Sequence, residues 1–310
     1  MSDDWREGYG RRPECKQCDK QGECESQGAP PEDGCPSAQP MSPQQQYEMQ
    51  ERKLQERAAF IDHEILVLSG KGGVGKSTVA ASLAWALALR DKRTGLLDAD
   101  LHGPTIPLMM GLQGQTPDGL GGLNPIPVIE SLKVMSIGFL LETPDTPIIW
   151  RGPARSGVIR QFVADVEWGA LDYLVVDLPP GTGDEALTVA QAFPTAAGAV
   201  VVTTPQEASL SDCRKAVNFL RTVKTPVLGV IENMGGFVCP HCGEETAIFG
   251  NGGGERMAQE MEVPFLGRIP LVPEVVAMGD SGRPLLGPDA PEAVRLAFQR
   301  IADGIEGALQ

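Results

Sequence analysis

The sequence contains no long hydrophobic run. Its longest apolar helical stretch, residues 79–89, is much shorter than the roughly 20 residues that a transmembrane helix requires. The N-terminal residues, Met-Ser-Asp-Asp-Trp-Arg-Glu, also lack the apolar stretch of a secretory signal. We therefore expect a cytoplasmic protein that makes no membrane contact.

Positive charge is also scarce. The chain has 26 Lys and Arg against 41 Asp and Glu, which gives a formal net charge of −15. Because nucleic acids and anionic membranes are bound through basic surfaces, this balance disfavours both as partners. With 310 residues, 42% of them hydrophobic, the chain is long enough for one large α/β domain with appendages.

Residues 1–41 have almost no aliphatic side chains and cannot bury enough apolar surface to fold unaided. They nevertheless carry four cysteines spaced C-x2-C-x5-C-x10-C, namely Cys15, Cys18, Cys24 and Cys35. A bound metal would supply the missing folding energy, and four thiolates suit either zinc or a [4Fe–4S] cluster. Zinc sites usually pair two C-x2–4-C motifs. The single C-x2-C here favours the cluster, with zinc and an unligated tail as alternatives.

A polar helix follows this segment. Ser42-Pro43 is typical of an N-cap with proline in the first turn, and the polar pattern through Phe60 predicts a helix. We therefore divide the chain into a cysteine-rich segment (1–41), a helical linker (42–60) and a large domain (61–310). The pattern leaves open whether the linker helix docks on that domain.

The strongest motif follows a buried-strand pattern at residues 65–68. It runs Gly70-Lys71-Gly72-Gly73-Val74-Gly75-Lys76-Ser77-Thr78 and fits G-x-x-x-x-G-K-[ST], the phosphate-binding loop, between a strand and a helix. Glycines allow backbone N–H groups to converge on phosphate oxygens at a helix N-terminus. Lys76 is predicted to contact the β- and γ-phosphates and Ser77 to bind Mg²⁺. A glycine-rich turn without a ligand is the alternative.

Lys71 is a second lysine in this loop, and a plain phosphate loop does not need it. Extra positive charge at the tip would repel Lys76 unless more anion were present. We therefore predict that Lys71 contacts phosphate held by a partner subunit. A solvated loop lysine is the alternative.

Three carboxylates follow predicted strands. Asp98 and Asp100 end a strand predicted over 93–100, and Asp177 ends a hydrophobic strand that starts at Leu171, the Walker B pattern. Ligands of open α/β folds bind at this edge of the sheet. Asp177 is predicted to hold Mg²⁺ through water, while one of Asp98 and Asp100 positions the attacking water and the other organises Mg²⁺ waters. A surface turn is the alternative for this pair.

The loop after Asp177 runs Leu178-Pro179-Pro180-Gly181-Thr182-Gly183-Asp184. Paired prolines stiffen its start, and the glycines allow its tip to rearrange when γ-phosphate is bound. It is predicted to be a nucleotide-sensing switch, with a rigid Pro-Gly turn as the alternative. The Gly- and Pro-rich residues 113–128 predict a plain surface loop, and residues 263–271 predict the last strand.

Cys239 and Cys242 form a C-x-x-C pair, half of a four-ligand site, and no second pair follows. The missing half could come from the N-terminal segment or an identical subunit, or be absent. A two-fold axis would supply it from the same pair, and because Lys71 also indicates a dimer, we favour this arrangement. A redox disulfide is the alternative. Cys213 has no thiol near it in the sequence and is predicted to be a core or helix-face residue.

Residues 61–280 resemble the Mrp-type (ApbC-like) ATP-dependent iron–sulfur cluster carriers. These belong to the deviant Walker A class, with the nitrogenase iron protein and the Min and Par ATPases. The resemblance rests on the phosphate loop with Lys71, on Asp98-x-Asp100 with Gly-Pro-x-Ile-Pro, on Asp177-Leu-Pro-Pro-Gly-Thr-Gly-Asp, and on Glu232-Asn-Met through Cys239-x-x-Cys242.

This resemblance implies a doubly wound, mostly parallel sheet of the P-loop NTPase type and slow ATP hydrolysis. It implies that Lys71 acts across a nucleotide-sandwich homodimer and that Asn233 and Pro270 lie at the adenine. ATP is favoured over GTP because no Asn-Lys-x-Asp motif follows a strand. Cys239 and Cys242 of two subunits would hold a [4Fe–4S] cluster and pass it to apo iron–sulfur proteins.

The N-terminal cysteines resemble the ferredoxin-like extension of one branch of that family, although here Cys35 follows the C-x2-C-x5-C run instead of a cysteine preceding it. Two other functions remain open. A nucleotide-gated electron donor would also use ATP and a bridging cluster. A Min- or Par-like positioning ATPase would explain Lys71, but it would need a basic surface or tail, which the terminal residues 291–309 do not supply.

Overall fold

The computed structural model describes residues 42–118, 123–141, 153–239 and 241–310. The four N-terminal cysteines lie outside these residues. The chain divides into two compact units, residues 1–49 and 50–310, and the second contains the sheet. Within the described ranges, no helix is long and apolar enough to cross a membrane.

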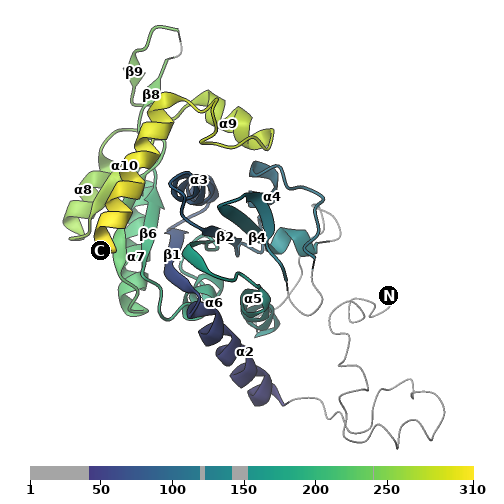
Figure 1. Cartoon of the computed structure of the whole chain (residues 1–310). Helices are drawn as coiled ribbons and strands as arrows, with labels where there is room; N and C mark the ends of the chain where they lie inside the picture. The colour runs from purple at the N-terminus through teal and green to yellow at the C-terminus, as the bar shows by residue number, and fades with distance from the viewer. Residues whose placement is uncertain (1–41, 119–122, 142–152, 240) are drawn as a thin grey trace, which may run out of the picture. The chain divides into compact units, whose positions relative to one another are not determined.

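The second unit is built on an eight-stranded sheet with the order β10-β7-β6-β1-β5-β2-β4-β3 (Figure 1). All neighbouring strands run parallel except β3, which is antiparallel to β4. The strands are β1 (Ile61–Ser69), β2 (Thr94–Asp98), β3 (Ile126–Ile129), β4 (Leu132–Ser136), β5 (Leu171–Asp177), β6 (Gly198–Thr203), β7 (Val227–Glu232) and β10 (Phe265–Arg268).

The central strands are buried on both faces. In β1, Ile65 to Leu68 are fully buried, and β5 and β6 are similar. Such continuous hydrophobic runs are expected where helices cover both faces of a parallel sheet. The sequence expectation of a mostly parallel α/β fold is confirmed.

Helices cover each face. Because crossovers between parallel strands are right-handed, the strand order places α3 on one face and α5, α6, α7 and α8 on the other. Helix α10 packs on α3, and α4 contacts both α3 and α9 (Figure 1). The helices are α3 (Lys76–Ala88), α4 (Ile106–Met109), α5 (Pro153–Asp165), α6 (Asp184–Gln191), α7 (Glu207–Thr222), α8 (Gly253–Glu260), α9 (Pro273–Asp280) and α10 (Glu292–Ala308).

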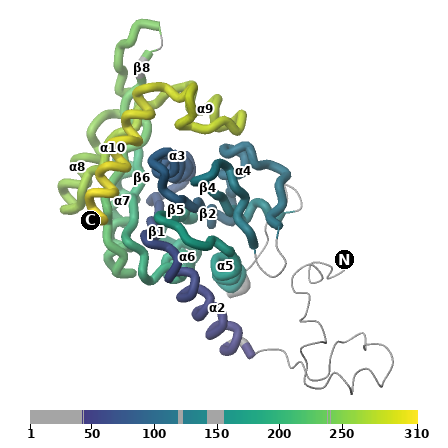
Figure 2. Tube along the Cα trace, viewed as in Figure 1, coloured from purple at the N-terminus to yellow at the C-terminus, as the bar shows by residue number. Residues whose placement is uncertain are grey.

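A two-stranded antiparallel hairpin follows β7 in the chain. Its strands are β8 (Phe237–Val238) and β9 (Glu245–Thr246). It forms its own small sheet and projects away from the main one (Figures 1 and 2). This places the C-x-x-C motif on an extension of the domain.

Helix α2 (Pro43–Ala58) precedes β1, and its last turns dock on the domain. Leu54 is buried in the main core, and Nη1 of Arg57 donates to the Val163 carbonyl at 2.8 Å. Nη2 of Arg57 also pairs with the buried Glu64 of β1 at 3.4 Å. The sequence left docking open, and tertiary contacts decide in its favour.

Three element boundaries differ from the sequence prediction. Strand β2 ends at Asp98, and β10 covers only part of the predicted 263–271. The region predicted as a loop, 113–128, includes most of the edge strand β3. This strand forms because it can pair with the otherwise unpaired edge of β4. Cys213 is fully buried on α7, as predicted.

Candidate functional site: the phosphate loop, its pocket and the thiol hairpin

The phosphate loop connects β1 to α3, as the motif predicts. Gly73 and Gly75 adopt positive φ angles of 80° and 79°, which favour glycine. Gly70 is needed for a different reason. A Cβ at that position would lie 2.2 Å from the carbonyl carbon of Asp212 in α7. The loop therefore lies directly against the backbone of α7.

Lys76 occupies the centre of the site and is buried. Its Nζ lies 2.6 Å from Oδ1 of Asp177, 3.9 Å from Oδ2 of Asp100 and 3.3 Å from Oγ of Ser77. Strands β2 and β5 are neighbours, and Asp98 is paired with Asp177 in their register. The structure thus brings the predicted lysine and carboxylates together at one edge of the sheet.

Asp98 and Asp100 have different surroundings because β2 ends at Asp98. The Oδ2 atom of Asp98 accepts from the Ser136 hydroxyl at 2.9 Å and from the Ile106 N–H at 3.4 Å, and its Oδ1 accepts from the Asp100 N–H at 3.2 Å. Complete burial raises the pKa of Asp98 to about 8, and the neighbouring Asp177 carboxylate adds to the rise. Asp98 therefore holds the following loop, whereas Asp100 lies toward Lys76.

Asp177 is fully buried and has one carboxylate oxygen, Oδ2, without a hydrogen-bond partner among the described residues. Burial raises its pKa, while the ammonium of Lys76 opposes the rise. A buried, unpartnered carboxylate oxygen beside a serine hydroxyl is a donor set that suits hydrated Mg²⁺. Ser77 and Asp177 therefore fit the predicted magnesium site.

The predicted switch loop is tied to β1 by its backbone. The N–H of Leu178 donates to the Val67 carbonyl at 3.0 Å, and that of Gly181 donates to the Ser69 carbonyl at 2.8 Å. Helix α6, which follows this loop, contacts the loop after β2, because Nε2 of His102 lies 2.9 Å from Oε1 of Glu185 in the first turn of the helix. Sequence reasoning missed this pair, because the two residues are 83 positions apart and neither belongs to a predicted site.

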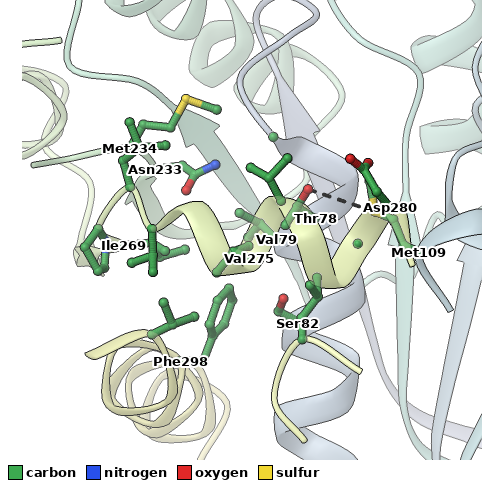
Figure 3. A pocket seen from close by; sticks show the side chains of 18 of the residues that line it. Thr78, Val79, Ser82, Met109, Asn233, Met234, Ile269, Val275, Asp280 and Phe298 are labelled. Carbon is green, nitrogen blue, oxygen red and sulfur yellow. Dashed lines mark hydrogen bonds between the residues drawn. The ribbon is translucent and has the colours of Figure 1, made fainter. Parts of the chain in front are cut away.

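A pocket of about 300 Å³ adjoins the phosphate loop, between α3, α4, α9 and α10. Figure 3 shows Asn233 and Ile269 at one end of it and Met109 and Asp280 at the other. Pro270 also lines it, so the structure places both residues expected at the adenine in one pocket. Nδ2 of Asn233 donates to the Val74 carbonyl at 2.9 Å and so fastens the pocket to the phosphate loop.

Sequence reasoning missed Ser82. It lines the same pocket (Figure 3), and its hydroxyl is buried without a hydrogen-bond partner among the described residues. The only available signal was its spacing of four from Thr78, which places both on one face of α3.

Cys239 and Cys242 lie at the turn of the hairpin. The Cys239 N–H donates to the Glu244 carbonyl at 3.0 Å, and the Gly243 N–H donates to the Cys239 carbonyl at 2.8 Å. Hydrogen bonds from the backbone N–H groups of Cys242 and His241 lower the pKa of Cys239, because they stabilise its thiolate. Cys242 is exposed, and both are free thiols.

One chain provides only half of a four-thiolate site here. Within the ranges that the structure describes, no group of three or more His, Cys, Asp or Glu side chains could hold a metal ion. Cys213, the third described thiol, is buried behind the phosphate loop, where burial raises its pKa.

Known proteins with similar sequences contain the same nucleotide-binding domain. The sequence profile described as ParA, NUBPL iron-transfer P-loop NTPase, matches residues 60–306, more than half of the chain. The chain belongs to this family. A curated relative from Methanocaldococcus jannaschii, named iron–sulfur cluster carrier protein, is 47% identical over 294 residues, covering 94% of this chain and 98% of that protein. A protein of the same name from Saccharolobus solfataricus is 47% identical over 265 residues, covering 84% of this chain and 88% of that one.

Solved structures support the same P-loop NTPase fold. A nucleotide-binding protein from Archaeoglobus fulgidus, in complex with ADP and with cobalt, is 43% identical. That comparison covers 75% of this chain and 91% of that chain, with a TM-score of 0.67. The cell division ATPase MinD of Pyrococcus furiosus is 23% identical, covers 79% of this chain and 99% of its own, and has a TM-score of 0.57. At that identity MinD supports the fold alone.

Proposed function

We propose that this member of the NUBPL iron-transfer P-loop NTPase family is an ATP-dependent iron–sulfur cluster carrier. Two copies hold a [4Fe–4S] cluster as cargo and pass it to apo iron–sulfur proteins. The observation that carries the proposal is the hairpin, which presents Cys239 and Cys242 as one pair of free thiols outside the core. The names of the relatives from M. jannaschii and S. solfataricus support the same cargo.

The hairpin geometry favours cluster ligation over a structural role. Thiolates are the ligands of iron–sulfur clusters, and the N–H groups that lower the pKa of Cys239 favour its thiolate. Two thiols per chain become four around a two-fold axis. Because the pair lies on an exposed extension, an acceptor protein can approach the cargo directly.

The nucleotide part of the proposal uses the phosphate-loop residues. ATP would bind to residues 70–78, with its base between Asn233 and Pro270. Lys76 would exchange its ion pair with Asp177 for contacts to the β- and γ-phosphates, which frees both oxygens of Asp177 for the waters around Mg²⁺. Bound Mg²⁺ would neutralise charge that develops on the phosphates during hydrolysis.

Two further roles complete this proposal. Lys71 would contact the phosphates held by the partner subunit in the homodimer. Asp100, whose Oδ2 lies 3.9 Å from Nζ of Lys76, would position the attacking water, while Asp98 holds the loop that follows it. The N-terminal cysteines, Cys15, Cys18, Cys24 and Cys35, would bind a second [4Fe–4S] cluster.

The decisive experiment is cluster transfer by the double variant Cys239→Ala/Cys242→Ala. After anaerobic reconstitution, wild-type protein should activate an apo-acceptor, whereas the double variant should bind ATP normally and fail to transfer. Cys213→Ala, which removes a buried thiol, is the matched control and should transfer like wild type. Transfer by the double variant at the wild-type rate would sink the assignment.

A further inference from the structure

The wall of the nucleotide pocket and the root of the thiol hairpin share one stretch of backbone, residues 269–271. The side chains of this stretch line the pocket. Its main chain bonds the loop that leads into the hairpin: the Gly235 N–H donates to the Ile269 carbonyl at 3.0 Å, and the Leu271 N–H donates to the Gly236 carbonyl at 2.7 Å. A displacement of the pocket wall therefore acts directly on the start of the hairpin.

Glu232, the last residue of β7, accepts hydrogen bonds from the segment that follows the hairpin. The chain leaves the sheet after Glu232, forms the hairpin, and returns at Gly252 to Gly254 where α8 begins. The N–H groups of Gly252 and Gly254 both donate to the Glu232 carboxylate, at 3.2 and 2.6 Å. The Glu232 side chain thus joins the start of the segment that carries the thiols to its end, 20 positions later in the chain.

Glu232 also bonds the pocket wall, through both its carboxylate and its backbone carbonyl. Nε of Arg268, the last residue of β10, donates to Oε1 of Glu232 at 2.6 Å, and the next residue, Ile269, donates its N–H to the Glu232 carbonyl at 2.8 Å. Glu232 is fully buried, so the bonds to its carboxylate are charge-assisted and shielded from water. Such bonds are short and directional, which makes the connection stiff.

Close packing leaves this connection little freedom. A Cβ on Gly235 would lie 2.3 Å from Cγ of Arg268, and a Cβ on Gly254 would lie 2.9 Å from Cβ of Glu232. Densely packed interiors transmit displacements instead of absorbing them. The loop, the arginine and the start of α8 are therefore expected to shift together.

We propose that Glu232 is a positioning residue that couples the two sites. Through its pair with Arg268 it makes nucleotide occupancy of the pocket change the position, and hence the reactivity, of Cys239 and Cys242. This inference rests on the nucleotide-binding part of the proposed function and names how that binding regulates the thiols. By linkage, a ligand that binds the thiols reversibly should change nucleotide affinity by the same factor by which nucleotide changes the affinity for that ligand.

The test measures thiol reactivity in the full-length, metal-free protein. Iodoacetamide labelling of each cysteine is followed by mass spectrometry without nucleotide, with Mg-ADP and with a non-hydrolysable Mg-ATP analogue. In wild type, nucleotide should change the labelling rate of Cys239 and Cys242 by about five-fold or more, the usual lower range for coupled sites. In Glu232→Gln, nucleotide should still bind, but this factor should fall toward one.

Glu255→Gln is the matched control. Glu255 also faces Arg268, at 3.7 Å, but is half exposed, so its loss should leave the coupling at the wild-type value. If Glu232→Gln does not fold, Arg268→Lys keeps the charge, removes the Nε donor and should weaken the coupling in the same way. The buried Cys213 serves as an internal reference for unfolding.

Two results would overturn the inference. One is a wild-type protein that binds nucleotide without any change in Cys239 and Cys242 labelling. The other is full coupling retained in folded Glu232→Gln and Arg268→Lys. Neither result depends on cluster transfer, so a failure of the carrier assignment is distinguishable: it would appear as intact coupling with no transfer to an acceptor.

Discussion

Gly70 shows how much one residue of the phosphate loop contributes to packing. Its lack of a side chain allows the loop to lie against the Asp212–Cys213 backbone of α7. A Cβ added to Gly72, two residues later, would meet nothing within 4 Å, and Gly72 has no positive φ. The two glycines occupy the same motif, but only the first is required by packing.

We therefore expect Gly70→Ala to lower the free energy of unfolding by about 1–3 kcal/mol, the usual cost of overpacking. Gly72→Ala should change it by less than about 0.5 kcal/mol. Urea denaturation of the two variants compares these costs directly. Equal stability of the two variants would contradict the packing role of Gly70.

Lys71 differs from Lys76 in its contacts. Lys76 is buried among carboxylates, whereas the Lys71 side chain is half buried and no hydrogen bond or ion pair of its ammonium group is found within the described ranges. This contrast is what a residue reserved for a partner subunit would show, and it supports separate roles for the two lysines.

Lys71→Ala should therefore bind ATP with near wild-type affinity and lose hydrolysis by about 10-fold or more, as expected when a charge that stabilises the transition state is removed. Lys76→Ala should lose binding itself. Equilibrium binding and steady-state hydrolysis separate the two effects. If Lys71→Ala hydrolyses ATP normally, Lys71 has no role across the dimer.

At the scale of elements, helix α2 is fastened to the domain by ion pairs of two kinds. Arg57 and Glu64 are both buried, and the Arg57 guanidinium also lies 4.5 Å from the centre of the Phe193 ring. Burial raises the pKa of Glu64, although Arg57 opposes the rise. Lys53 pairs with Asp165 at 2.6 Å, but its side chain is 41% exposed.

Removal of the Arg57 side chain should lower the free energy of unfolding far more than removal of the Lys53 side chain. Arg57→Ala leaves a buried carboxylate without its partner, which costs about 3–5 kcal/mol, whereas exposed pairs are worth about 0–1 kcal/mol. Because Glu64 can escape this penalty by binding a proton, the loss in Arg57→Ala should grow as pH rises above the ordinary carboxylate pKa. Denaturation at several pH values measures this slope.

The rescue variant Arg57→Ala/Glu64→Gln should recover part of the loss and flatten the slope. If the single Arg57→Ala variant is as stable as Lys53→Ala at every pH, the buried pair does not hold α2.

At the scale of the whole molecule, the proposed function requires a second copy of the chain. A single chain contributes two hairpin thiols, and four are needed for a cubane cluster. The net charge of −15 opposes close approach of two copies, so the bonds that a shared cluster forms to both chains would have to hold them together. Assembly and cargo binding should therefore occur together.

Anaerobic reconstitution should give about six irons per chain, one N-terminal cluster and half of a shared one, by four-thiolate ligation. Cys239→Ala/Cys242→Ala should lose about two of them and elute as a smaller species in oxygen-free size-exclusion chromatography. Iron and sulfide analysis with light scattering measures both quantities. An unchanged iron count in that variant would place the cargo elsewhere.

The sequence by itself determined the strand–loop–helix of the phosphate loop, the Walker B strand ending at Asp177 and the C-x-x-C pair. These features are local: glycine positions, a buried run and a two-thiol spacing each specify their geometry within a few residues. The parallel sheet was also predictable, because its strands are continuous hydrophobic runs.

Tertiary structure decided the rest. Docking of α2, the different surroundings of Asp98 and Asp100, the His102–Glu185 pair and the bonds around Glu232 all join residues that are far apart in the sequence or separated by a strand end. Such contacts depend on strand order and on the residue at which each strand stops. Strand order is not encoded by a local pattern, and the sequence pattern placed the end of β2 two residues too late. Only the folded chain therefore shows that one buried carboxylate connects the pocket beside the phosphate loop to the thiol hairpin.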